Sequence, residues 1–495
     1  MGDPAVAVAR ADVVPDRTTL FRDGQWLPAA SDRTVALVDP ATEEPLGSAP
    51  WGDEADVDAA VASARRAVDA GEWGRSTRED RADALERLAT AIESRGDDLA
   101  RLVSREIGQP ITVSRRFSVE RPVAVLRYYA RLVRTRETEE TRPALLRPGH
   151  TLVRREPLGV VGMVVPWNFP QALTISKLAP ALAAGCSVVL KPAAESSLDA
   201  CVLAEAVEAA GLPPGVFNLV TGGRDTGEHL VRHPAVDKIA FTGSTAAGRR
   251  IASICGELLR PVTLELGGKS AAIVLPDADI GTVTSQLTMG SFGNAGQTCF
   301  LLSRVLAPRS RYDEVVDALR GIATGFVLGD PLDERTTMGP LVSERQRTRV
   351  AGYVAQGRDE GARLVTGGQR PEGLDRGYYF APTVFVDVRN DSPLARQEIF
   401  GPVVCVLPYE REDEAVALAN DSEYGLGGSV FTADPERGLA VARRIQTGTI
   451  GLNGYTPDVT APFGGYKASG LGRENGPEAI GSYENVKSMY VTESR

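Results

Sequence analysis

Short apolar runs alternate with helix-length segments throughout residues 157–268, and this alternation constrains the fold more than any other feature of the chain. The run Val160–Val165 stops at Pro166 and is typical of a strand buried inside a parallel sheet. The next segment has Pro170 near its start and Gly185 just past its end, a pattern that predicts a helix. Strands that alternate with helices of about 10 to 15 residues indicate a doubly wound parallel sheet. The same pattern predicts further strands at Val188–Leu190, Val216–Val220, Ile239–Phe241 and Val262–Leu266, and helices over 197–210, 226–232 and 245–258.

A second α/β unit is predicted to begin near Gly267 and to end at about residue 465. A chain of 495 residues exceeds one ordinary core, so two or three domains are expected. Residues 134–156 turn at Pro148-Gly149 and predict a projecting hairpin. Residues 1–20 lack a clear period and predict a loose arm. Further predictions are helical segments over 53–70 and 80–105, the latter with Leu85, Leu88, Ile92, Leu99 and Leu102 on one face; strands at Ala271–Leu275, Arg304–Ala307, Val403–Val406 and Gly428–Phe431; and a short edge strand at Ser488–Thr492.

Composition excludes several classes of function. With 43% apolar and 24% charged residues, the chain is typical of a soluble globular protein, and its net charge of −10 argues against nucleic acid or an anionic membrane as a partner. No apolar run approaches the roughly 20 residues of a membrane helix, and Met1–Pro4 does not start a secretory pattern, so we expect a cytoplasmic protein. The cysteines never form a Cys-x-x-Cys pair, which argues against a disulfide framework and a metal site; they are Cys186, Cys201, Cys255, Cys299 and Cys405.

Polar residues follow the predicted strands of the first sheet. Ligands of doubly wound sheets bind beyond the carboxyl ends of the strands, where packing does not explain a succession of polar side chains. We therefore expect a site at this edge. The residues concerned are Asn168, Lys191, Thr221-Gly222-Gly223, Thr242-Gly243-Ser244 and Glu265.

Cys299 is the candidate nucleophile, because it ends the small-residue loop Gly293–Cys299 that would let a substrate reach the sulfur. Glu265 is the candidate base, and Asn168 with the Cys299 backbone N–H could hold an oxyanion. Each has a structural alternative: an inert buried thiol, a salt-bridge partner for Glu265, and a helix cap for Asn168. The histidines lie in charged or proline-flanked segments, so proton transfer is expected from a carboxylate; they are His150, His229 and His233.

Three glycine-rich segments need separate interpretations. Gly243–Gly248 follows a strand and opens a helix, so it either binds phosphate or is a plain turn. Gly267–Ser270 resembles the end of a nucleotide P-loop, but Thr263 stands where that motif needs glycine and a strand follows, which argues against ATP. In Phe463–Gly470, Phe463 either walls an apolar pocket or anchors the loop.

Together, these segments closely resemble the NAD(P)-dependent aldehyde dehydrogenase superfamily, in the family's order and from about residue 20 to the C-terminus. The resemblance implies two doubly wound parallel-sheet domains plus a small oligomerisation element of hairpin and tail. The matching segments are Pro166-Trp167-Asn168-Phe169-Pro170, Lys191-Pro192, Phe241-Thr242-Gly243-Ser244, Glu265-Leu266-Gly267-Gly268-Lys269, Gly296-Gln297-Thr298-Cys299, Glu398-Ile399-Phe400-Gly401-Pro402 and Pro462-Phe463-Gly464-Gly465. The implied division is an arm at 1–20, a dinucleotide-binding domain at 21–133 and 157–266, a catalytic domain at 267–465, and an oligomerisation element at 134–156 and 484–495.

The resemblance also implies residue roles. Cys299 would attack an aldehyde, Asn168 would stabilise the thiohemiacetal oxyanion, and Glu265 would activate the water that hydrolyses the thioester. Lys191 would belong both to the catalytic residues and to the cofactor contacts. A dimer or a tetramer is expected. The implied cofactor contacts are Pro166, Trp167, Lys191, Glu195, Gly223, Thr242, Gly243, Ser244, Leu266, Glu398 and Phe400, and the implied substrate pocket contains Phe169, Phe300 and Phe463.

One departure concerns the cofactor. Many NAD-preferring relatives place a glutamate three residues after the lysine, where this chain has Ala194 followed by Glu195. NADP therefore stays possible, and Ser196 and Ser197 could contact its 2′-phosphate. NAD is favoured because we expect no arginine nearby to pair with that phosphate. Phe300-Leu301-Leu302 after the cysteine predicts an apolar or aromatic aldehyde as substrate. The alternatives are a CoA-acylating relative, which usually lacks the glutamate base, and a non-catalytic binding or structural protein on the same scaffold.

Overall fold

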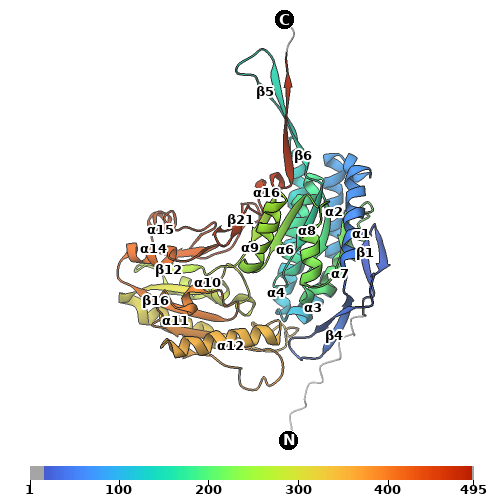
Figure 1. Cartoon of the computed structure of the whole chain (residues 1–495). Coiled ribbons are helices and arrows are strands. Elements are labelled where there is room, and N and C mark those ends of the chain that lie inside the picture. The colour runs from blue at the N-terminus through green and yellow to red at the C-terminus, as the bar shows by residue number, and fades with distance from the viewer. Residues whose placement is uncertain (1–15, 493–495) are drawn as a thin grey trace.

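The computed structural model describes residues 16–492, which form the arrangement in Figure 1. The arm predicted over residues 1–20 falls mostly on residues 1–15, outside the described part. Within that prediction, Thr19 and Leu20 belong instead to the strand β1, Thr19–Arg22, because Leu20 and Phe21 are buried and join a sheet.

The first sheet contains eight strands in the order β2-β1-β9-β8-β7-β10-β11-β21. Its five central strands, from β9 to β11, are parallel, whereas β1, β2 and β21 pair antiparallel at the edges. The doubly wound parallel sheet predicted for 157–268 is therefore present. The bounds not yet given are β2 Gln25–Pro28, β7 Val160–Val164, β8 Ser187–Lys191, β9 Phe217–Leu219, β10 Lys238–Thr242, β11 Val262–Glu265 and β21 Gly470–Leu471.

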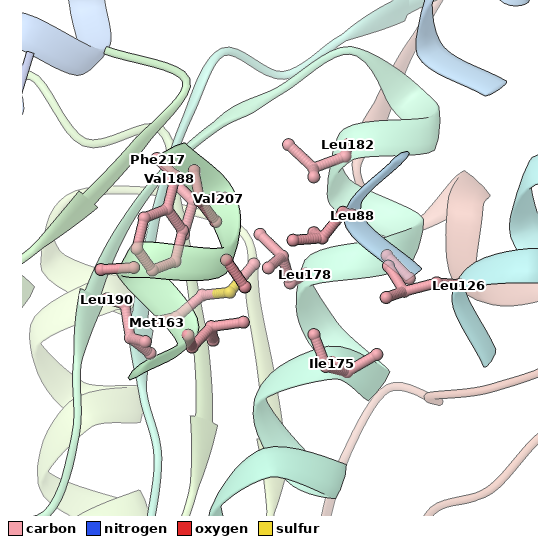
Figure 2. Packing of buried hydrophobic residues seen from close by; sticks show 14 of the residues in the cluster. Leu88, Leu126, Met163, Ile175, Leu178, Leu182, Val188, Leu190, Val207 and Phe217 are labelled. Carbon is pink, nitrogen blue, oxygen red and sulfur yellow. The ribbon is translucent and has the colours of Figure 1, made fainter. Parts of the chain in front are cut away.

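Helices cover both faces of this sheet, and the strand sequences explain why. Val160 and Val189 pack on one face, whereas their neighbours Val161 and Val188 pack on the other, which is the two-residue period of a strand buried on both sides. Figure 2 shows one of these cores, where Leu178 and Leu182 of α6 lie between the strands and Leu88 and Leu126 of an outer helix pair. The helices of that face are α2 Arg78–Ser94, α5 Arg121–Thr135, α6 Pro170–Ala184 and α7 Ser197–Ala209, and those of the opposite face are α1 Glu54–Asp69, α8 Arg224–Arg232 and α9 Thr245–Glu257.

The helical segment predicted over 80–105 is two helices. α2 ends at Ser94, and α3 runs over Gly96–Ile107 after a break at Arg95. Val119 packs against Gly96, where a Cβ would lie 2.9 Å from its side chain. Glycine weakens a helix interior and favours a break here. The helical spacing of apolar residues nevertheless continues from α2 into α3.

The second sheet contains seven strands in the order β14-β15-β16-β13-β12-β18-β19, parallel except for the edge strand β14. Its strands are β12 Ala271–Val274, β13 Arg304–Pro308, β14 Arg363–Thr366, β15 Thr383–Val386, β16 Val403–Tyr409, β18 Gly428–Phe431 and β19 Gly451–Leu452. The helices of this part are α10 Ile280–Phe292, α11 Tyr312–Gly325, α12 Glu344–Asp359, α13 Pro393–Arg396, α14 Glu412–Asn420 and α15 Pro435–Ala442.

A three-stranded sheet, β22-β6-β5, projects from the body of the molecule (Figure 1). It contains the hairpin predicted at 134–156, formed by β5, Glu139–Pro143, and β6, His150–Pro157. The tail strand β22, Glu484–Val491, is longer than predicted because it pairs with β6 along its whole length. The remaining elements are β3 Thr34–Val38, β4 Pro45–Pro50, β17 Tyr424–Gly425, β20 Tyr466–Lys467, α4 Ile111–Arg115 and α16 Glu478–Gly481. In residues 16–492, no helix is both long and apolar enough to cross a membrane.

Candidate active site

The predicted polar residues gather at one edge of the first sheet. β7, β8, β10 and β11 are parallel neighbours, so their carboxyl ends meet at this edge. Lys191 ends β8, and Thr242 and Glu265 end β10 and β11 as register partners. Asn168 follows β7 in the turn before α6 and is 3% exposed.

Asn168 contacts the loop that carries the candidate nucleophile. Its side-chain Nδ2 donates a hydrogen bond to the backbone oxygen of Gln297, 2.9 Å away. In return, Nδ2 of Asn294 donates to the backbone oxygen of Asn168, also over 2.9 Å. The first contact uses one of the two N–H bonds of the Asn168 amide and fixes the plane of the other. The second N–H of the Asn168 amide therefore stays available, next to Gln297, which precedes Cys299 by two residues.

Cys299 is half-buried, whereas the other four cysteines are buried. Burial raises the pKa of the Cys299 thiol, and the nearby carboxylates of Glu398 and Glu265 raise that pKa further. The backbone of Gly268 lies against Cys299, since a Cβ on this glycine would sit 2.3 Å from the Cys299 carbonyl oxygen. The segment after Glu265 thus packs directly on the nucleophile loop. A thiol in this setting needs a base before it can attack.

Glu265 is buried at 3% exposure, and neither of its carboxylate oxygens has a hydrogen-bond donor among residues 16–492. Burial raises the pKa of Glu265 well above its ordinary value, and the Glu474 carboxylate raises that pKa further. The backbone of Gly464 borders the carboxylate, because a Cβ there would lie 2.8 Å from Glu265 Oε1. A buried, unpaired carboxylate beside a thiol is a general-base candidate, and not the salt-bridge partner that was its structural alternative.

Two residues beside Glu265 were not predicted from the sequence. Lys177 Nζ lies 2.6 Å from Glu474 Oε1, and both side chains are almost fully buried. Lys177 Nζ also donates a hydrogen bond to Oγ1 of Thr242, the predicted cofactor contact. The positive charge of Lys177 lowers the pKa of Glu265 and opposes the effect of Glu474. Lys177 is the one charged residue of α6, and this was the available sequence signal.

The turn from β10 into α9 is built as a phosphate site requires. Ser244 caps the helix by accepting a hydrogen bond from the Ala247 N–H at 3.3 Å. Gly248 packs against Leu266, where a Cβ would lie 2.4 Å from the leucine side chain, so the helix approaches the sheet closely. The remaining N–H groups of the first turn attract anions. This geometry fits the pyrophosphate of a dinucleotide.

Lys191 is 7% exposed and lies beside α8, since a Cβ on Gly227 would sit 3.6 Å from its Cδ. Its ammonium group has no hydrogen-bond acceptor among residues 16–492. Burial lowers the pKa of Lys191 to about 8, and the carboxylates of Glu195 and Asp225 act in the opposite direction. Gly223 caps α8 next to Asp225 and lies against Trp51, where a Cβ would sit 2.3 Å from the ring. An ammonium group without a protein acceptor fits a ligand hydroxyl.

The expectation that no arginine lies near Glu195 is wrong. Nη2 of Arg345 donates a hydrogen bond to Oε1 of Glu195 over 3.2 Å. Arg345 stands in the first turn of α12, 150 residues further along the chain, so adjacency in the sequence gave no sign of it. A guanidinium group near the predicted ribose site bears on the choice between NAD and NADP.

The segment Glu398–Phe400 closes the site from the second sheet. The backbone N–H of Gly268 donates to Glu398 Oε1 over 3.1 Å, and burial raises the pKa of Glu398 to about 7. Phe400 has a φ of 60°, a backbone conformation uncommon outside glycine, and its ring meets Trp167 edge-on at 5.5 Å between centroids. Pro166, half-buried, leads from β7 into Trp167.

Aromatic side chains surround the nucleophile. Phe300, which directly follows Cys299, lies 5.2 Å from the ring of Tyr455 and 6.1 Å from that of Phe463. Phe169 contacts Phe117, with 4.8 Å between ring centroids. Tyr455 and Phe117 were not predicted from the sequence. In residues 16–492, no group of three or more His, Cys, Asp or Glu side chains is arranged to hold a metal ion.

Comparisons with known proteins find relatives along nearly the whole chain. The sequence model of the aldehyde dehydrogenase family matches residues 26–489. Geranial dehydrogenase from Castellaniella defragrans is 53% identical over 476 residues, which are 96% of this chain and 99% of that protein. The structure of a Mycobacterium tuberculosis aldehyde dehydrogenase complexed with NAD+ superposes with a TM-score of 0.94 and 45% identity, covering 96% of this chain and 98% of that one.

A third similarity is to another solved structure. It is a mutant of aldehyde dehydrogenase C from Pseudomonas syringae complexed with NAD+ and octanal. The TM-score is 0.92 at 41% identity, and the alignment covers 95% of this chain and 96% of that one.

Proposed function

This chain belongs to the aldehyde dehydrogenase family, and on that premise we propose that Cys299, Asn168 and Glu265 oxidise an apolar aldehyde to its carboxylic acid. The chain is an aldehyde dehydrogenase, and its cofactor is NAD. The observation that carries the residue roles is the contact between the two sheets: Gly268 packs on the Cys299 backbone, and the charge of Glu265 acts on the thiol.

In the first half of the proposed reaction, Cys299 attacks the aldehyde carbon. The thiol is protonated at neutral pH because burial raises its pKa, so a base must take its proton, and Glu265 is the buried carboxylate beside it. The carbonyl oxygen becomes an alkoxide as the C–S bond forms. The free N–H of Asn168 and the backbone N–H of Cys299 stabilise that alkoxide.

A bound nicotinamide would supply the hydride acceptor, and loss of hydride from the thiohemiacetal carbon would leave a thioester on Cys299. Glu265 releases the proton of the thiol to solvent, and its carboxylate then removes a proton from water as the water oxygen attacks the acyl carbon. The C–S bond breaks, the sulfur leaves as a thiolate, and the carboxylic acid is released. The presence of Glu265 supports hydrolysis over transfer of the acyl group to CoA.

The chain's own residues would hold the cofactor at three places. The N-terminal turn of α9, capped by Ser244, would bind the pyrophosphate. Lys191 and Glu398 would hold ribose hydroxyls, since one offers an ammonium group and the other a carboxylate. Phe400 and Trp167 would pack beside the nicotinamide ribose.

The proposed substrate is a medium-to-large apolar aldehyde. The rings of Phe300, Tyr455 and Phe463 offer an apolar surface next to the nucleophile. Two similar proteins support this class, because one is named geranial dehydrogenase and another was solved with octanal.

The proposed assembly is a dimer or a tetramer built on the projecting sheet. This sheet exposes apolar side chains that a monomer would leave in water, with Val486 66% and Tyr490 75% exposed, and Leu145 and Leu146 more than 90% exposed at the hairpin tip. We place the protein in the cytoplasm, which the five free cysteines support.

Two variants test the reaction. C299A is expected to reduce turnover to the background rate while NAD binding, measured by calorimetry, stays unchanged. E265Q is expected to slow both the first turnover of NADH formation and the steady state, because Glu265 is the proposed base for the thiol and for the hydrolytic water. C255A, which removes a buried thiol elsewhere, is the matched control and should turn over normally. Turnover by C299A would show that another group is the nucleophile, and acyl-CoA formation would show that the thioester goes to CoA.

A further inference from the structure

The loop before Cys299 has a backbone conformation that its sequence does not favour. Asn294 (φ 54°, ψ 41°) and Ala295 (φ 52°, ψ 36°) are both left-handed, and neither is glycine. Asparagine adopts this region more often than most residues other than glycine, but alanine rarely does, and left-handed residues occur mostly one at a time. Contacts elsewhere must therefore hold the loop in place.

Asn294 supplies those contacts through every polar group of its side chain. Nδ2 donates to the backbone oxygen of Asn168 over 2.9 Å, and Oδ1 accepts from Nε2 of Gln109 over 3.2 Å. Its backbone oxygen accepts from the backbone N–H and from Nε2 of Gln297. These residues are all at most 7% exposed, so water does not compete for the bonds.

Gln109 determines which way the Asn294 amide faces. Oε1 of Gln109 accepts a hydrogen bond from the Ser114 hydroxyl over 3.2 Å, which directs its Nε2 toward Asn294. If the Asn294 amide were flipped, its NH₂ group would meet the NH₂ group of Gln109 and its oxygen would meet the Asn168 oxygen. The network therefore allows only one orientation, with Nδ2 toward Asn168.

Asn294 and Asn168 bind each other's segments reciprocally. The side chain of Asn168 donates to the backbone of the nucleophile loop, and the side chain of Asn294 donates to the backbone oxygen of Asn168. We infer that Asn294, oriented by Gln109, is a positioning residue that holds the Asn168 amide where the oxyanion forms. The inference rests on the proposed role of Asn168 as the oxyanion donor.

The first test compares N294G with A295G. Glycine accepts the left-handed backbone at both positions, so both variants preserve the loop, but only N294G removes side-chain hydrogen bonds. We expect N294G to lower kcat/KM for the aldehyde roughly tenfold and A295G to stay within about twofold of the parent. NAD affinity, measured by calorimetry, should be unchanged in both. Equal activity of the two variants would overturn the inference.

A double-mutant cycle separates positioning from a general structural effect. N168A alone should lower kcat about a hundredfold, as expected for the loss of an oxyanion donor. If Asn294 acts through Asn168, then N168A/N294G should be no slower than N168A within about twofold, because the residue being positioned is gone. If the losses of kcat in the two single variants multiply in the double variant, Asn294 acts independently of Asn168, which would contradict the inference. An unaffected N168A would instead sink the proposed oxyanion role.

Q109M provides a second variant in case N294G does not fold. Methionine has a similar length and no amide, so Asn294 loses the contact that orients it. We expect a smaller loss than for N294G, roughly threefold, that also vanishes in the N168A background. A loss that persists in that background would contradict the inference.

Discussion

Lys177 and Glu474 form a buried ion pair whose charges act on the carboxyl group of Glu265, with Nζ and Oε1 of the pair 2.6 Å apart. The two charges act on Glu265 in opposite directions, because Glu474 raises its pKa and Lys177 lowers it. The protonation of Glu265 therefore depends on a pair that makes no bond to it. This arrangement gives a pH dependence that a substitution can shift.

The variant E474Q removes the negative charge and leaves Lys177 unopposed, so the pKa of Glu265 should fall. A base is active when deprotonated, and activity limited by Glu265 rises as the pH rises through its pKa. We expect the rising limb of the kcat–pH profile to move to lower pH by about one unit in E474Q. The exposed neighbour Glu478 offers the control E478Q, whose profile should match the parent. A limb that stays in place or moves to higher pH would exclude this coupling.

NAD affinity should weaken as the pH falls through 7. Glu398 has a pKa of about 7, and its carboxylate is the form that accepts hydrogen bonds from a ribose. Between about pH 8 and about pH 6, we expect the Kd for NAD to rise roughly fivefold as this group protonates. In E398Q the Kd for NAD should be higher than that of the parent at about pH 8, and it should stay nearly constant down to about pH 6. Calorimetric titrations at several pH values measure both, and a parent enzyme with a flat profile would contradict the assignment.

Arg345 should contribute more to the affinity for NADP than to the affinity for NAD, the cofactor. Its guanidinium, 3.2 Å from Glu195, partly neutralises the carboxylate that would repel a 2′-phosphate and is a suitable phosphate ligand itself. We expect R345Q to raise the Kd for NADP roughly tenfold and to change the Kd for NAD less than about twofold. R347Q, on the same helix but stacked on Tyr378, is the control. Equal losses for both cofactors would mean that Arg345 does not discriminate between them.

The ring of Phe300 should matter for long aldehydes and not for short ones. Its contacts with Tyr455 and Phe463 make it part of an apolar surface that only a longer chain reaches. We expect F300A to lower kcat/KM for octanal roughly tenfold and for acetaldehyde less than about twofold. F326A, which removes a ring packed on Phe292, controls for general effects of ring loss. A parent enzyme that prefers short polar or charged aldehydes would refute the apolar substrate class.

The sequence predicts best what depends on neighbours along the chain. Apolar runs ending in Asn168, Lys191 and Glu265 identified the strand ends, because parallel strands place their carboxyl ends at one edge. The pairs Lys177–Glu474 and Glu195–Arg345 were missed, since each joins segments far apart in the chain. The helical spacing of apolar residues also continues from α2 into α3, although the helix breaks just before Gly96. Packing against the core determines the apolar spacing, whereas glycine favours the break.

The left-handed backbone at Asn294 and Ala295 was equally beyond sequence reasoning. Positive φ is expected at glycine, and here Gly296 lies one residue later. Only the contacts of Asn294 with Gln109 and Asn168 reveal why the loop bends where it does.

The surroundings of Glu265 are completed by a segment near the end of the chain. β21 pairs with β11 at Glu265, Gly464 lies against the carboxylate, and Glu474 joins Lys177. A nascent polypeptide on the ribosome would already contain Cys299, Asn168 and Glu265 long before these residues are translated. Its thiol and carboxylate would face solvent without their final neighbours. The enzyme should thus acquire activity only after nearly the whole polypeptide has been synthesised, because Gly464 and Glu474 complete the surroundings of Glu265.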